Sequence, residues 1–441
     1  MFLREKKKIR RLFFLILIIS CCACTACARI EVQSTNAPSE ASIKAADLFD
    51  EDESELFDIE NMKKHKEKYV EEHTLVSAMQ WYPGDIEFRN QITSVTFTNQ
   101  KPETYEEEWV AGANDSKKIR GYRQGTQVYI VGESIYLNER AAYMFHAESY
   151  PSLKEINGLE FLDTSRCTNM RCMFNQYKGQ IEGIDKWDVS KVQSMQMMFA
   201  GCTEVTHLDI ADWDVSSLRD ASAMFQSSGS HTADMKLESL DLSKWRTPAL
   251  REMSHMFYGC AQLKELDLKD WDVSQVMSLS HLFADCYSLE KINFENWDTS
   301  RVASFDALFN DCHSLKTIDI TPLETCNGTM FSQMFESCHS LEQIIGIEEM
   351  DVSTAEYYAF SEMFHCCKSL TTLNLSKWTT GHADNMARMF AQCPNLTDVN
   401  VTGWDISSVE TMFEMCYGSP YVNLIGSGEW DLTNINTEKM Y

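Results

Sequence analysis

The sequence is poor in basic residues relative to acidic ones. Lys and Arg number 39 against 66 Asp and Glu, and the formal net charge at pH 7 is −27. Nucleic acid needs basic side chains to neutralise its phosphates, so this balance argues against a nucleic-acid partner. It argues equally against direct adsorption to an anionic lipid surface. An acidic, well-hydrated surface suits cationic or basic partners instead.

The chain also lacks the short motifs of common enzymes. It contains no H-E-x-x-H, G-x-S-x-G, Walker-type or kinase motif. His73 follows Glu71 and Glu72 and is interpreted as part of a solvated helix face. We therefore expect no enzyme activity, no cofactor, no metal and no catalytic residue. Hydrolase activity within residues 61–150 remains an alternative.

No apolar run is long enough to span a bilayer, which takes roughly twenty residues. The run Leu12 to Ile19 follows a basic segment, a pattern typical of a signal peptide over residues 1–20. The sequence Ile18-Ile19-Ser20-Cys21 resembles the lipobox of bacterial lipoproteins, which implies lipidation of Cys21. We then expect a lipid anchor on the outer face of the cell membrane. Cleavage at Ala26-Cys27-Ala28 would give a secreted protein instead.

The next two segments differ in composition. Residues 21–60 are polar and acidic, and predict a disordered tether. Residues 61–150 predict a small mixed α/β module, with a helix from Met62 to Glu72 and a strand from Ile92 to Phe97. A β-hairpin is expected around Gly132-Glu133-Ser134. Such a module would cap the repeats that follow.

Residues 151–441 repeat themselves. The motif W-D-x-S recurs in phase, and most successive anchors lie 26 residues apart, at Trp187, Trp213, Trp245, Trp271, Trp297, Leu323, Met350, Trp378, Trp404 and Trp430. The one long interval contains an insertion around Gln226 to Lys236. A fixed period of this length predicts a solenoid in which each repeat forms one coil.

Each coil has two apolar patterns. Leu263, Leu266 and Leu268 form L-x-x-L-x-L before Trp271, which predicts a strand. After the Trp, apolar residues such as Val276 and Phe283 recur at a spacing that predicts a short helix. A cysteine follows three residues after the Phe in most coils, and we expect these thiols to be buried, reduced and structural.

A polar position recurs four residues before the Trp. Alternation along the strand places it on the opposite face from the apolar residues, which is the concave face of a curved solenoid. This column is the candidate ligand-binding surface: Asp209, Asp241, Asp267, Asn293, Asp319, Asn374 and Asn400. Stacked carboxylates repel one another, so pairing with Lys or with backbone donors, or binding of a cation, are the alternatives. Charges of both signs surround it, which favours a polar ligand. His313 and His339 also share a phase, and without a third ligand they are a weak indication of zinc.

The repeat unit resembles that of the BspA-like leucine-rich-repeat surface proteins of bacteria and mycoplasmas. The stretches that carry the resemblance are WDVSKVQSMQMMFAGC from Trp187 and LKELDLKDWDVS from Leu263. The resemblance implies an α/β fold: a right-handed solenoid of about ten strand–turn–short-helix coils behind the N-terminal module. It also implies export and adhesion to a protein or glycan on a host or microbial surface. A passive spacer or stalk is the alternative.

Overall fold

The computed structural model describes residues 53–76, 81–227, 235–356 and 358–441. The predicted signal peptide, Cys21 and most of the predicted tether lie outside these residues. The chain divides into residues 1–59 and 60–441, and the architecture below is that of the second unit. Among the described residues, no helix is both long enough and apolar enough to cross a bilayer.

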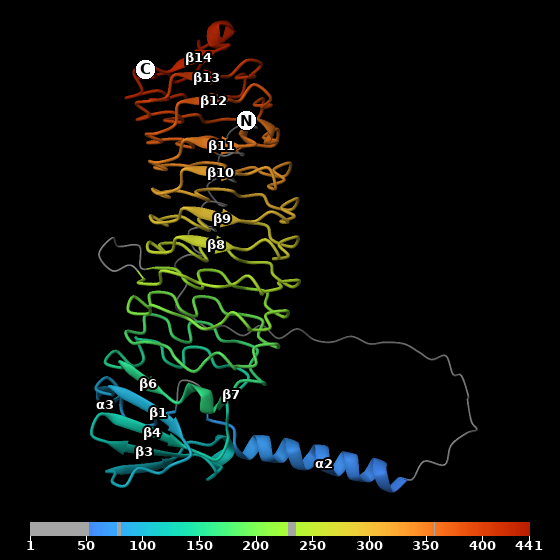
Figure 1. The fold of residues 1–441 in the computed structure, drawn as a ribbon, viewed down its shortest axis with the longest axis vertical. Helices are drawn as coiled ribbons and strands as arrows, with labels where there is room; N and C mark the ends of the chain where they lie inside the picture. Colours follow the sequence, from blue (N-terminus) through green and yellow to red (C-terminus); the bar gives the residue numbers. More distant parts are fainter. Residues whose placement is uncertain (1–52, 77–80, 228–234, 357) are drawn as a thin grey trace, which may run out of the picture. The chain divides into compact units, whose positions relative to one another are not determined.

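Helices and a sheet form the first part of the described chain. Helix α2 (Glu53–Glu72) includes the stretch for which a helix is predicted, and α3 (Ile86–Arg89) is a single turn capped by Asp85. The sheet has the order β2-β3-β4-β1-β6 (Figure 1). Its strands are β1 (Ser94–Thr98), β2 (Glu107–Val110), β3 (Arg120–Gln124), β4 (Gln127–Val131) and β6 (Glu155–Asn157).

The hairpin expected around residues 132–134 is wrong. β4 pairs antiparallel with β3, and the two-residue connection places Gly125 at φ 59°. Glycine adopts this left-handed conformation without a Cβ clash, as tight hairpin turns require. The strand after Gly132, β5 (Ile135–Tyr136), pairs instead with β7 (Leu162–Asp163), because its apolar residue packs on the first coil.

The sheet continues into the repeats. β1 pairs in parallel with β4 on one side and with β6 on the other, and β6 belongs to the first coil. Trp81 is fully buried, and its Nε1 donates to the carbonyl of Met144 at 2.9 Å. The N-terminal residues thus supply strand and hydrogen-bond partners to the start of the repeat array.

Seven short parallel strands recur at the same place in successive coils, one per coil (Figure 1). In most of them the central residue is buried between exposed neighbours; in β8, Leu266 is 3% exposed between exposed Glu265 and Asp267. In β9 the central Ile292 is only partly buried. The strands are β8 (Glu265–Asp267), β9 (Lys291–Asn293), β10 (Thr317–Asp319), β11 (Gln343–Ile345), β12 (Thr372–Asn374), β13 (Asp398–Asn400) and β14 (Asn423–Ile425). This is the leucine-rich-repeat type of fold.

The short helix expected after each Trp is wrong for the described part of residues 151–441. An α-helix sends every N–H to the fourth residue back in its own segment. Here the N–H of Met195 donates to Asp220 in the next coil at 2.9 Å, and that of Met198 closes a tight turn on Met195 at 3.0 Å. Met197, at φ 55°, interrupts any right-handed helix. The segment therefore alternates bonds within the coil and bonds between coils.

The core is a set of side-chain stacks along the coils. Phe283 lies 5.6 Å from Phe257 and 5.7 Å from Phe309, ring centroid to ring centroid, and is almost fully buried. The tryptophans stack in the same way, and Trp271 donates through Nε1 to the carbonyl of Leu242 at 3.3 Å. Because that carbonyl belongs to the preceding coil, the indole satisfies a buried acceptor as well as filling space.

The cysteine column is confirmed as buried and reduced. The Sγ of Cys312 contacts the carbonyl oxygen of Phe283, in the preceding coil, at 3.2 Å. The same contact recurs at Cys286 and Cys338. Burial raises the pKa of these thiols. All the described cysteines are free thiols.

Candidate functional site

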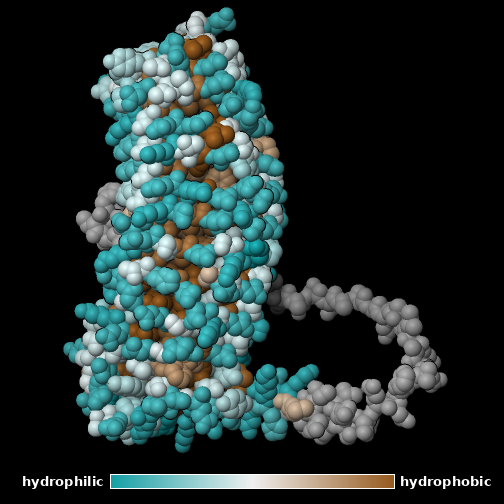
Figure 2. Space-filling model, in the orientation of Figure 1, coloured by the Kyte–Doolittle hydropathy of each residue, from teal (hydrophilic) through white to brown (hydrophobic). Residues whose placement is uncertain are grey.

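The outer face of the strands carries polar side chains of both signs. The position just before β8, β9, β10 and β11 alternates in charge, as Lys264, Glu290, Lys316 and Glu342, and Glu238 continues the alternation at the equivalent position of the coil before β8; all five are exposed. Figure 2 shows a narrow apolar column between hydrophilic side chains on the face in view. A face of this kind offers hydrogen-bond donors and acceptors at the coil spacing.

The structure brings only part of the predicted ligand-binding column together within paired strands. Asp267 lies beside Asn293, and Asn374 lies beside Asn400. Asp319 is paired with Ile345, which interrupts the polar column. Asp209 and Asp241 are exposed but lie outside the named strands.

The column residues also have a local task. Asp241 Oδ1 accepts hydrogen bonds from the backbone N–H of Ser243 at 3.0 Å and from its hydroxyl at 2.7 Å. These two bonds hold the pKa of Asp241 below its ordinary value. Asn400 accepts in the same way from the N–H of Thr402 at 3.1 Å. The side-chain oxygen of either Asp or Asn can therefore accept this hydrogen bond and form the turn, and the turn does not need the negative charge.

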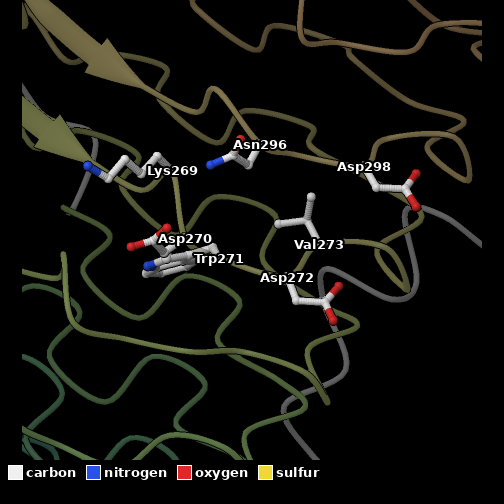
Figure 3. A pocket seen from close by; sticks show the side chains of 7 residues that line it. All are labelled: Lys269, Asp270, Trp271, Asp272, Val273, Asn296 and Asp298. Carbon is white, nitrogen blue, oxygen red and sulfur yellow. The ribbon is translucent and has the colours of Figure 1, made fainter.

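A hollow lies where β8 and its neighbour turn into the Trp position (Figure 3), lined by Lys269, Asp270, Trp271, Asp272, Val273, Asn296 and Asp298. The carboxylates of Asp272 and Asp298 lie on the same side of Val273. Each accepts the N–H of the serine two residues on, at 3.0 Å, and Asp270 pairs with Arg246 at 2.9 Å. These acidic groups are thus engaged within the protein.

The turn segments of successive coils carry a charged ladder that sequence reasoning missed. Arg388 bridges Glu362 at 3.1 Å and Glu414 at 2.8 Å, in the preceding and following coils. Lys439 extends the ladder, with its Nζ 3.5 Å from Glu414. These four residues have positive φ, in the left-handed region, and occupy equivalent positions in successive coils. Their alternating charge in one phase of the repeat was the available signal.

Histidines stack at two positions of the coils: His255 and His281 share the left-handed position of this ladder, and His313 and His339 directly follow Cys312 and Cys338. His313 stacks on His339 at 4.3 Å between ring centroids, and His255 stacks on His281 at 4.7 Å. Burial, followed by the neighbouring His281, lowers the pKa of His255 from 6.5 to about 4. Within the described ranges, no three His, Cys, Asp or Glu side chains gather as metal ligands would. The stacked imidazoles are packing partners in this arrangement.

A family model matches three overlapping stretches of the chain, residues 140–238, 231–347 and 308–430. Together they extend from the first coil almost to the last and cover more than half of the sequence. The family is described as "Mycoplasma protein of unknown function, DUF285". The chain belongs to this family. None of the curated proteins matches the chain.

Solved leucine-rich-repeat structures align with this member at low similarity. A leucine-rich repeat protein from Bacteroides ovatus has 14% identity, covers 66% of this chain and 80% of its own, and gives a TM-score of 0.24. A leucine rich cell surface protein from Faecalibacterium prausnitzii has 14% identity and covers 72% and 89%, with a TM-score of 0.24. A leucine-rich repeat protein from Eubacterium ventriosum has 12% identity and covers 69% of this chain and 93% of its own, also with a TM-score of 0.24.

Proposed function

We propose that this protein is an exported surface protein that binds a polar ligand, a glycan or a charged protein patch on a host or microbial surface, across the outer face of its strands. The observation that carries the proposal is the alternation of exposed Lys and Glu before successive strands, beside the Asp and Asn column. Single contacts of this kind are weak, and many coils acting together would make binding useful. The proposal includes membership of the BspA-like group.

The column residues have two roles, the hydrogen bond of the local turn and the proposed contact with the ligand, and the test separates them. Changing Asp241, Asp267 and Asp319 to Asn removes three charges but keeps an acceptor for the turn, as Asn293 and Asn400 do naturally. Ligands are first found by screening the full chain on glycan and protein arrays. We expect the triple Asn variant to lose at least about tenfold in affinity, a loss of roughly 1.4 kcal/mol.

The matched control exchanges acidic residues away from the strands. Asp188→Asn, Asp214→Asn and Asp405→Asn together also remove three charges, at positions that form side-chain turns through Ser190, Ser216 and Ser407. These changes are expected to leave binding intact. Equal loss in both variants would indicate a general charge effect, and full binding by the triple variant would contradict the strand face as the site. The protein would then be a spacer, or would bind through residues 61–150.

Surface attachment is a separate part of the proposal. Lipidation of Cys21 predicts that the protein partitions with membranes and that Cys21→Ala releases it or stalls its processing. Fractionation and N-terminal sequencing of the mature protein check this. A mature N-terminus at Arg29 would instead indicate simple secretion.

A further inference from the structure

Cys366 is set apart from the other repeat cysteines by its backbone. It has φ 60° and occupies the second left-handed position of its coil, which Gly201 and Gly259 occupy in other coils. Its neighbour Cys367 takes the buried column position and contacts the carbonyl of Phe335 at 3.1 Å. The left-handed turn places the two adjacent thiols in different surroundings, and Cys366 is only half-buried.

Cys366 lies against an oriented imidazole. Its Sγ is 3.5 Å from Nε2 of His365, and Nδ1 of the same ring is 3.0 Å from Oε1 of Glu336 in the preceding coil. Glu336 is held in turn, because its Oε2 accepts from Asn310 at 3.0 Å. The carboxylate favours the proton on Nδ1, which leaves the lone pair of Nε2 facing the thiol. This is the nucleophile–base–orienter order of activated cysteines.

We propose that Cys366 is a modification site at which a low-molecular-weight disulfide forms a mixed disulfide with the protein, with His365 as the base and Glu336 as a positioning residue. The thiol passes its proton to Nε2 of His365, and the thiolate attacks one sulfur of the disulfide. The disulfide bond breaks, and Cys366 keeps one half. The other half leaves as a thiolate and takes the proton back from His365.

The groups around Cys366 explain why its thiol needs His365 as a base and which charge on the disulfide is favoured. Burial raises the pKa of the Cys366 thiol; Lys368 opposes this, while Glu336 and Asp311 add to it. The thiol proton of Cys366 is therefore transferred to the imidazole of His365, which contacts the thiol, and not to water. The acidic neighbours outnumber Lys368, so a cationic disulfide is favoured over an anionic one.

Cys326 is a matched comparison within the same chain. It is exposed, and its contact is with the side-chain amide of Asn327 at 3.8 Å, not with an imidazole. The column cysteines are buried and serve as internal negative controls. The full chain is incubated with cystamine or with oxidised glutathione, and each site is followed by peptide mass mapping over a pH series.

We expect cystamine to modify Cys366 in the folded protein, faster than glutathione does, with the difference shrinking at high salt. His365→Asn should slow Cys366 about a hundredfold, the lower end of the usual range of general-base effects, and leave Cys326 unchanged. Glu336→Gln should shift the pH profile of Cys366 while thermal unfolding stays the same. Cys366→Ser should remove the adduct.

Two results would overturn the proposal. One is a Cys366 that stays as unreactive as Cys312 in the folded chain. The other is a rate and pH profile at Cys366 that do not change in His365→Asn, because exposure alone would then account for the reaction.

Discussion

At the scale of single residues, the position that holds Cys393 in one coil and Ser419 in the next has one role, which is to contact the carbonyl of a phenylalanine in the preceding coil. The thiol of Cys393 contacts the carbonyl of Phe364 at 3.0 Å, and in the following coil the hydroxyl of Ser419 donates to Phe390 at 2.6 Å. The position therefore calls for a small side chain with a weak donor, and either residue supplies it. A buried carbonyl left without this partner would cost about 1–3 kcal/mol.

The phenylalanine stack gives the first stability prediction. Phe283→Ala removes a ring that is 1% exposed between two others, and should lower the free energy of unfolding by about 3–5 kcal/mol. Glu265→Ala, on the exposed side of β8, should change it by less than about 0.5 kcal/mol. Denaturant unfolding of both variants checks this. Equal losses would contradict the inward and outward assignment of the two residues.

Two partly buried histidines predict acid sensitivity. The folded pKa of His255 is about 4 against an ordinary value of 6.5, so the unfolded chain binds more protons between these values. Its contribution to stability is therefore complete above pH 6.5 and is lost as the pH falls toward 4. His339, with a pKa of about 4, acts in the same direction.

His255→Gln tests this, since Gln333 already occupies the equivalent left-handed position of another coil. The melting temperature of the parent should fall between pH 6.5 and 4 more steeply than that of the variant. Parallel curves would show that carboxylates alone set the acid response.

At the scale of elements, the coil segments after each Trp depend on their neighbours. Strands pair across coils, and the turn segments do the same through every second N–H, as Phe199 does with Met224 at 2.9 Å. Ion pairs between side chains of successive coils add to these hydrogen bonds where residues of opposite charge alternate, as they do around Arg388. The elements of one coil are thus incomplete without the next coil.

The ladder through Arg388 gives a prediction at this scale. Arg388→Gln removes two ion pairs at a position where Gln333 is tolerated, and should cost roughly 1 kcal/mol at low salt, because the guanidinium is partly exposed. Lys377→Gln breaks a single exposed pair with Glu349 and should cost less. Unfolding at low and high salt checks both. An Arg388 effect that is unchanged by salt would indicate lost packing instead of charge.

For residues 60–441 as a whole, stability is expected to be a sum over coils and their interfaces. Removing residues 272–297 joins Trp271 to Asp298 and deletes one repeat in phase. This variant should fold, with a modest fall in melting temperature. Removing only residues 272–284 puts the following stacks out of phase and should prevent folding. Circular dichroism and thermal melts distinguish the two outcomes, and equal behaviour would contradict the modular stack.

The sequence by itself determined the repeat, its phase and its core. The period, the strand positions such as Leu266 and the buried cysteine column follow from residues that recur every coil, since identical positions in a stack meet identical surroundings. Pairing of the column with backbone donors was an expected alternative, but the turn that Asp241 and Asn400 form was not specified, because a polar residue at a strand end fits both a turn and a ligand site.

Only the tertiary structure decided how the second half of each coil is built and which side chains meet across coils. The apolar spacing around Phe283 satisfies a helix and a chain of tight turns equally, and the hydrogen bonds to the next coil select the turns. The contact of Cys366 with His365 likewise depends on a left-handed residue, and the orientation of His365 depends on Glu336, 29 positions away in the preceding coil. Periodicity specifies which residues are buried, but the partner that satisfies each backbone group lies in another coil.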